Sequence, residues 1–224
     1  MDTTKKKKFS VRYIAVVAML AAIAYLMVFI CEPIPKVSGF LSYEPKDAVI
    51  VIAGFIFGPL TSILLSVLVS LIELVTVSQT GLIGFAMNVL SSCAFAVPAA
   101  LIYKKHRTKK GAMTGLAVGI LSMTLAMALW NYIITPLYMT GVTRDDIAGM
   151  LVPVFLPFNL IKSGLNAVIT MLLYNPIISA LRRTKLVAPA SEETKKKYSI
   201  GSVIAWIASG VTLVMLFLLL AGQI

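Results

Sequence analysis

Lys162 is the residue whose setting most strongly suggests chemistry. It is the only cation in an apolar stretch of about 35 residues that runs from Ile147 to Leu181. Asn159 precedes it by three residues and Asn166 follows it by four, so on a helix the amide, ammonium and amide groups share one face. A lysine deep in a membrane costs about 3 kcal/mol or more unless it is paired. The pattern indicates either a snorkelling or internally paired lysine, or a binding pocket for a polar solute.

The composition places that stretch in a membrane. Hydrophobic residues make up 59% of the 224 residues, and the mean hydropathy of +0.94 lies far above the range of soluble domains. Apolar stretches cover residues 13–31, 48–72, 81–103, 111–138, 147–181 and 200–222. Each is long enough to cross a hydrocarbon core at about 20 residues per crossing. The sequence therefore predicts an all-α integral membrane protein embedded in a lipid bilayer.

The basic residues report topology. The net charge is +11, but most of the 20 Lys and Arg residues gather in three clusters at 5–12, 104–110 and 182–197. The intervening loops on the other side are mildly acidic, which is the positive-inside pattern. We therefore expect all three clusters, and the N-terminus, on the cytoplasmic side, and we expect no nucleic-acid partner.

Clusters on one side require an even number of crossings between them. The stretch from residue 48 to 78 contains Gly58-Pro59, and a proline removes a backbone donor and clashes with the preceding turn. We therefore divide this stretch into a short helix from about Tyr43 to Phe57 and a second helix from Pro59 to about Val77. Further helices are predicted from Gly81, from Gly111 to about Ile134, and from Pro153 to Leu181.

This topology divides the chain into four parts. Residues 1–12 form a basic cytoplasmic N-terminus, and residues 13–181 form a six-helix membrane domain that carries the candidate site for a substrate. Residues 182–199 form a polar cytoplasmic linker, and residues 200–224 form an additional C-terminal transmembrane helix.

The unusual polar residues fall near the outward ends of these helices. They are Asn88, Asn131, Asn159 and Lys162, with Phe40 and Tyr43 on the first outer loop. An apolar cavity with a few amides, one cation and an aromatic lid suits a flat heteroaromatic solute with carbonyls and hydroxyls. Each asparagine could instead make an interhelical hydrogen bond. Glu73 lies at a depth similar to that of Lys162, so an ion pair between these two is the structural alternative.

Small residues mark one face of the first helix. Ala15, Ala18 and Ala22 follow one another at i, i+3 and i+7, a spacing that lets another backbone approach closely in lipid. The face either packs within the bundle or docks on another membrane subunit. The chain has no GxxxxGK[ST] phosphate loop, so an ATP-driven step would need a partner. Cys31, Cys93 and His106 have no spacing typical of a metal or disulfide site.

The segments that carry these residues resemble the S components of energy-coupling factor (ECF) vitamin transporters, and most closely the riboflavin-specific branch. The resemblance covers Arg12 to about Leu181. It rests on Ala18-xxx-Ala22, Phe40-Leu-Ser-Tyr-Glu-Pro-Lys-Asp47, Gly54-Phe-Ile-Phe-Gly-Pro59, Trp130-Asn-Tyr-Ile-Ile-Thr-Pro-Leu-Tyr138 and Leu156-Pro-Phe-Asn-Leu-Ile-Lys162.

The resemblance implies a riboflavin-binding subunit in a bacterial plasma membrane. Such a protein has no cofactor and no ATPase of its own, and it docks on a transmembrane coupling subunit driven by two ATP-binding cassette ATPases. Asn131, Asn159 and Lys162 would contact the ligand, and Ala18 and Ala22 would face the coupling subunit. The alternatives are an S component for pantothenate, folate or a similar vitamin, a stand-alone secondary carrier, and an intramembrane enzyme. The last two are disfavoured, because no repeat and no paired acids or Ser/His arrangement are evident.

Overall fold

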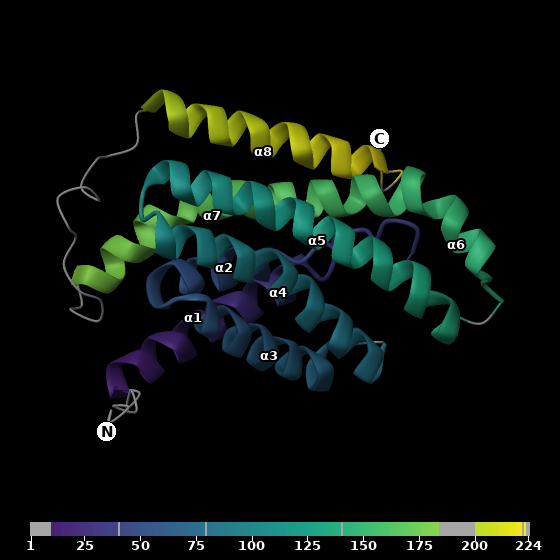
Figure 1. The fold of residues 1–224 in the computed structure, drawn as a ribbon, viewed down its shortest axis with the longest axis horizontal. Coiled ribbons are helices and arrows are strands. Elements are labelled where there is room, and N and C mark those ends of the chain that lie inside the picture. The colour runs from purple at the N-terminus through teal and green to yellow at the C-terminus, as the bar shows by residue number, and fades with distance from the viewer. Residues whose placement is uncertain are drawn as a thin grey trace, which may run out of the picture.

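The computed structural model describes residues 10–39, 41–78, 80–139, 141–183, 200–220 and 222. Within these ranges the chain is helical apart from turns, loops and one isolated bridge between Val37 and Leu41 (Figure 1). The elements are α1 (Val11–Cys31), α2 (Lys46–Phe57), α3 (Pro59–Thr76), α4 (Gly81–Lys105), α5 (Lys109–Tyr138), α6 (Arg144–Met150), the π-helical segment η1 (Leu151–Phe155), α7 (Leu156–Arg183) and α8 (Ile200–Leu220). The predicted all-α fold is confirmed.

Among the described residues, six helical segments are long and apolar enough to cross a membrane. They are α1, α3, α4, α5, the continuous run from α6 into α7, and α8. The remaining helix, α2, has 12 residues and is therefore about 18 Å long at about 1.5 Å per residue. With α2 included, α1 to α7 make the expected six-helix bundle and α8 is the expected seventh helix. The protein is therefore a multi-pass membrane protein.

The predicted break at Gly58-Pro59 separates α2 from α3. Gly58 has a φ of +103°, in the left-handed region that favours glycine, and Pro59 is the first residue of α3. Proline suits this position because a first-turn N–H has no partner within the helix. The turn reverses the chain, so that α2 and α3 pack against each other.

Protein surrounds α2 on every side. It contacts α1, α3, α4 and α7, and every residue from Lys46 to Phe55 is buried. Its first two residues, Lys46 and Asp47, are buried charged groups at the end of the bundle that carries the 32–45 loop. This central position explains how a helix too short to cross the hydrocarbon core by itself is accommodated.

Two glycines allow α4 and α5 to pack closely. A Cβ atom on Gly119 would lie 2.5 Å from the carbonyl oxygen of Phe95, and one on Gly115 would lie 2.7 Å from that of Ala99. Such contacts would be severe clashes with backbone atoms, so only glycine fits at these two places. Small residues at a helix interface are typical of membrane bundles, where close packing holds helices together.

The structure corrects the prediction for the start of the sixth core helix. The sequence predicted a helix from Pro153, but the helix begins at Arg144. Thr143 caps it by accepting a hydrogen bond from the backbone N–H of Asp146, whose side chain accepts one from the backbone N–H of Thr143. Pro153 lies in η1, where the wider π turn takes the place of regular α geometry. The run continues without interruption into α7.

One end of the bundle is basic. The junction between α4 and α5 exposes Lys104, Lys105, Lys109 and Lys110 at one end. The loop of residues 32–45 and the short helix α6 lie at the other end, where α5 finishes (Figure 1). Residues 1–9 and 184–199, which make up most of the other two basic clusters, lie outside the described residues.

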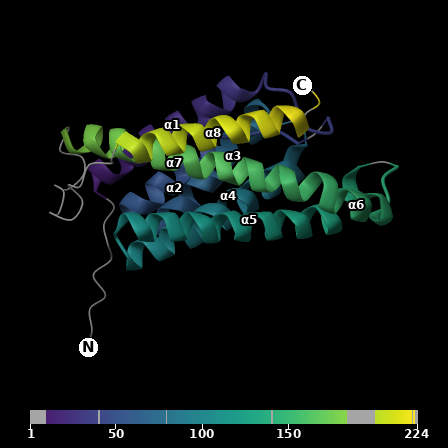
Figure 2. The ribbon, with the colours of Figure 1, turned by 90° about the horizontal axis from the view of Figure 1, so that it is seen from above.

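The additional helix α8 runs alongside α7, as both views show (Figures 1 and 2). Most of its apolar side chains are exposed, as expected for a helix whose outer face meets lipid. Its Leu220 end lies at the same end of the bundle as α6 (Figure 1).

Candidate functional site

A cavity of about 410 Å³ opens where the 32–45 loop meets α1, α3, α4, α5 and α7. Tyr43, Asn88, Asn131, Asn159 and Lys162, all predicted site residues, line it. The sixth predicted residue, Phe40, lies outside the described residues. These five side chains come from the loop, α4, α5 and α7 and converge on one space, whose volume is typical of small-molecule sites.

The 32–45 loop is tied to α7 by side-chain hydrogen bonds. The Tyr43 hydroxyl donates to Asn166 Oδ1 at 3.3 Å, and Asn166 Nδ2 donates to the backbone oxygen of Glu44 at 3.1 Å. Burial raises the pKa of the Tyr43 phenol, so the hydroxyl stays protonated and able to donate. Asn166 was predicted to share a face with Lys162, and here it fixes the loop over that face.

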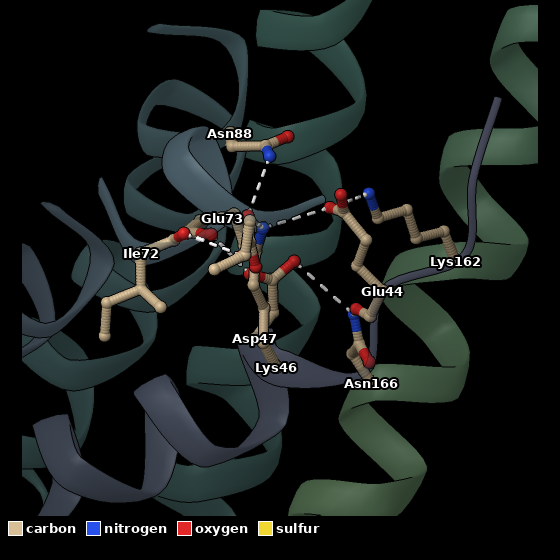
Figure 3. Close-up of polar contacts among 10 residues, drawn as sticks. Glu44, Lys46, Asp47, Ile72, Glu73, Asn88, Lys162 and Asn166 are labelled. Carbon is tan, nitrogen blue, oxygen red and sulfur yellow. Dashed lines mark hydrogen bonds and ion pairs between the residues drawn. The ribbon is translucent and has the colours of Figure 1, made fainter. Parts of the chain in front are cut away.

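Lys162 belongs to a chain of ion pairs that the sequence did not predict (Figure 3). Its Nζ donates to Glu44 Oε2 at 2.9 Å, and the same oxygen lies 3.3 Å from Lys46 Nζ. Lys46 Nζ in turn donates to Glu73 Oε2 at 2.5 Å. The alternative of a direct Lys162–Glu73 pair is therefore wrong. Glu44 and Lys46, on either side of Pro45 at the start of α2, connect Lys162 to Glu73 through successive ion pairs.

The ion pairs alternate in sign. Two ammonium groups face two carboxylates, so these four side chains carry no net formal charge. Burial alone would raise the pKa of Glu44, but the ammonium groups of Lys162 and Lys46 outweigh that effect and hold its pKa below the usual range. Glu44 therefore remains ionised and keeps the two lysines in place.

Asn88 and Glu73 form the other end of this chain. Asn88 Nδ2 donates to Glu73 Oε2 at 2.9 Å, an interhelical contact between α4 and α3. The second carboxylate oxygen, Glu73 Oε1, is buried and has no hydrogen-bond partner among the described residues. Both side chains line the cavity. An unpartnered buried acceptor on a cavity wall is available to a hydrogen-bond donor on a ligand.

Asn131 and Asn159 are oriented by bonds within their own helices. Asn131 Nδ2 donates to the backbone oxygen of Met127 at 2.7 Å, and Asn159 Nδ2 donates to that of Phe155 at 2.8 Å. Both residues are buried. Neither makes an interhelical hydrogen bond in the part of the chain that the structure describes, so that alternative does not explain them. Each keeps a second N–H, and Asn159 also keeps its carbonyl oxygen, for other partners.

Glu44 and Lys46 are the site residues that sequence reasoning missed. Their segment, Glu44-Pro45-Lys46-Asp47, was interpreted as ordinary loop charge, yet the Lys46 side chain is fully buried. Asp47, next to it, is buried and accepts a hydrogen bond from Ser92 at 2.5 Å. A run of charges joined directly to an apolar helix was the available signal, because such charges can lie inside the bundle only if they are paired.

The alanine face of α1 points away from the bundle. Ala15, Ala18 and Ala22 are exposed, whereas Ala21 and Ala24 are buried. Within the described chain, the face is therefore not used for internal packing. The three alanines form a strip of methyl side chains on the exposed face of α1.

The family comparison agrees with this architecture. The chain matches the family "ECF transporter, substrate-specific component" over residues 12–174. It is 30% identical to a chain in the solved structure "Structure and mechanism of the S component of a bacterial ECF transporter", with a TM-score of 0.63. That match covers 76% of this chain and 97% of the other.

Two relatives carry specific names. Over 172 residues the chain is 31% identical to "Riboflavin transporter RibU" of Staphylococcus aureus (strain TCH60), covering 75% of this chain and 90% of the relative. It is 28% identical over 172 residues to "Riboflavin transporter FmnP" of Bacillus subtilis (strain 168), covering 73% and 90%. The matched family and these relatives are transport proteins and not enzymes. The chain belongs to the family of substrate-specific S components of ECF transporters.

Proposed function

We propose that this protein captures riboflavin in the cavity beneath the 32–45 loop and delivers it to an ATP-driven ECF module. The observation that carries this proposal is a cavity of small-molecule size in which amide, carboxylate and ammonium groups converge from five parts of the chain. Riboflavin is a flat, uncharged ring system with carbonyl and imide groups and a polyhydroxylated side chain. Relatives that cover most of the chain are named riboflavin transporters, which supports the same solute.

The balanced charges of the ion-pair chain favour an uncharged solute. Lys162 is already ion-paired with Glu44, and Lys46 is already ion-paired with Glu73. Neither of these two lysines is left to neutralise an anionic solute. Pantothenate and folate carry carboxylates, which would meet Glu44 and Glu73 beside a Lys162 that is already paired. The ion-pair chain thus argues for riboflavin over these two vitamins.

The donors and acceptors on the wall match such a solute. Lys162 uses one of its three N–H donors on Glu44, which leaves others for carbonyl oxygens of the ring. Asn131 and Asn159 offer further N–H groups, and Glu73 Oε1 accepts from an imide or hydroxyl group. Tyr43 and Asn88 complete the wall. Phe40 belongs to this proposed set by its place in the sequence.

The orientation follows from the basic end of the bundle. The exposed lysines between α4 and α5 support a cytoplasmic position for that end, because basic loops favour the cytoplasmic side. With that orientation the N-terminus is cytoplasmic and the cavity opens outward. The exposed face of Ala15, Ala18 and Ala22 is the docking surface for a transmembrane coupling subunit, which two ATP-binding cassette ATPases drive. The location is a bacterial plasma membrane.

The purified protein is expected to bind riboflavin with one-to-one stoichiometry and to quench its fluorescence. Quenching follows because the ring would lie against aromatic and polar side chains and out of water. Titration in detergent or nanodiscs measures both quantities, with pantothenate and folate as competitors. Binding of either competitor in place of riboflavin would refute the assignment, whereas riboflavin binding that neither competitor displaces would support it.

Lys162→Met is expected to weaken riboflavin binding roughly 10- to 150-fold, since a hydrogen bond to a charged group contributes about 1.5–3 kcal/mol. The melting temperature should change little, because Glu44 keeps its contact with Lys46. Lys105→Met, which removes an exposed lysine at the opposite end of the bundle, is the matched control and should leave the affinity unchanged. A stable Lys162→Met variant with wild-type affinity would remove Lys162 from the site.

A further inference from the structure

The helix α8 lies beyond the region that matches the family, which ends at residue 174. It nevertheless packs closely on α7. A Cβ atom on Gly164 of α7 would lie 3.3 Å from Leu213 Cδ1, and one on Gly210 of α8 would lie 3.3 Å from Val168 Cγ1. Each helix thus presents a glycine to a branched side chain of the other. This contact fixes the position of α8 along α7.

The same face of α8 ends in Phe217. Although most apolar side chains of α8 are exposed, Phe217 is only 4% exposed. Its ring centre lies 5.9 Å from that of Tyr43 and 6.3 Å from that of Phe158, within the usual range for aromatic pairs. Phe217 joins a cluster of buried residues from the loop and from the start of α7, among them Val37 and Leu41.

Both aromatic partners of Phe217 belong to the cavity wall. Tyr43 and Phe158 line the cavity, whereas Phe217 stands behind them. Tyr43 is also the residue that ties the 32–45 loop to Asn166, and its neighbour Glu44 pairs with Lys162. The loop that covers the site therefore rests on a side chain of α8.

We propose that Phe217 is a positioning residue for the ligand site, which holds the Tyr43 loop closed over the bound solute and slows its release. This inference rests on the proposed function because it takes riboflavin as the bound solute. A solute under this loop leaves when the loop lifts from α7 and α8. Lifting separates Tyr43 from Phe217, so loss of this ring favours the open position of the loop.

The kinetic consequence is asymmetric. Removal of the Phe217 ring lowers the cost of opening the closed complex, so dissociation accelerates. Association requires the open position, whose population the loss of the ring does not lower, so association is not slowed. Phe217 thus controls residence time without contact with the solute.

The test compares Phe217→Ala with Trp206→Ala in the full-length protein. Trp206 is the other aromatic residue on the packed face of α8, about 16 Å away along the helix at about 1.5 Å per residue, and it packs against the other buried cluster. Riboflavin association and dissociation are followed by stopped-flow fluorescence, and melting temperature is measured for each variant. We expect roughly 10- to 100-fold faster dissociation for Phe217→Ala, and a change within about twofold for Trp206→Ala.

The outcomes separate this proposal from the proposed function. A wild-type protein that does not bind riboflavin refutes the proposed function. Wild-type dissociation kinetics in Phe217→Ala, or equal acceleration in both variants, overturn the role of Phe217 alone. Should Phe217→Ala not fold, Phe217→Leu keeps apolar bulk without the ring. Faster dissociation in that variant supports the proposal, and wild-type kinetics contradict it.

Discussion

Replacement of both Ala18 and Ala22 with tryptophan is expected to abolish riboflavin uptake by cells and to leave riboflavin binding intact. The two alanines are exposed on α1, and the indole rings would fill the strip that another backbone must approach. The cavity lies at the opposite end of the bundle from the basic junction and does not include these residues. Uptake and binding are measured separately, by accumulation in cells and by titration of the purified protein.

The matched control places tryptophan at Ala205 and Ala208, which are exposed on α8. These substitutions add the same bulk to a lipid-facing surface that we do not assign to a partner, so uptake should continue. Uptake that survives in the Ala18/Ala22 variant, with the coupling subunit still co-purifying, would show that the α1 face is not a docking surface.

Lys46→Met is expected to lower the free energy of unfolding by about 3–5 kcal/mol, the usual cost of breaking a buried ion pair by removal of one partner. Lys46 is fully buried and contacts both Glu44 and Glu73. Its loss leaves Asn88 as the remaining hydrogen-bond partner of Glu73 among the described residues. Thermal unfolding in detergent, with and without riboflavin, measures the effect.

A second substitution tests the cause of that loss. Glu73→Gln in the same chain removes the unpaired carboxylate and should restore a large part of the stability, because the carboxamide oxygen can still accept from Asn88. Lys105→Met, on the surface, should change stability by no more than about 0.5 kcal/mol. If the double variant is less stable than Lys46→Met alone, an unpaired Glu73 is not the cause.

The pattern of apolar stretches and the Gly58-Pro59 break were sufficient to predict the helices. Both signals are local in the sequence. The hydropathy of a stretch shows whether it can cross the membrane, and a proline disrupts the helical turn in which it lies. The start of α6 was missed because two local signals conflicted there. Thr143 and Asp146 form a capping box, and Pro153 suggested a later start; the capping box determined where the helix begins.

Part of the cavity lining could also be predicted from local sequence signals. Asn131, Asn159 and Lys162 lie on long helices whose depth in the membrane follows from topology, so their convergence could be anticipated. The partner of Lys162 could not, because Glu44 is 118 residues away in the chain and belongs to a loop. Which of several nearby carboxylates a lysine meets depends on loop conformation, and periodicity carries no information about it.

The burial of α2 has a consequence for biosynthesis. A helix of about 18 Å that begins with Lys46 and Asp47 cannot be released into a lipid core of about 30 Å as an independent segment. Lys162, which completes its ion-pair chain, follows Glu44 by 118 residues, or about 6–24 s of translation at about 5–20 residues per second. Until α7 has been synthesised, the ion-pair chain of the nascent bundle lacks Lys162, the partner of Glu44. Substitutions in α7 should therefore reduce the yield of inserted protein through degradation of unfinished bundles, even where the finished protein would bind normally.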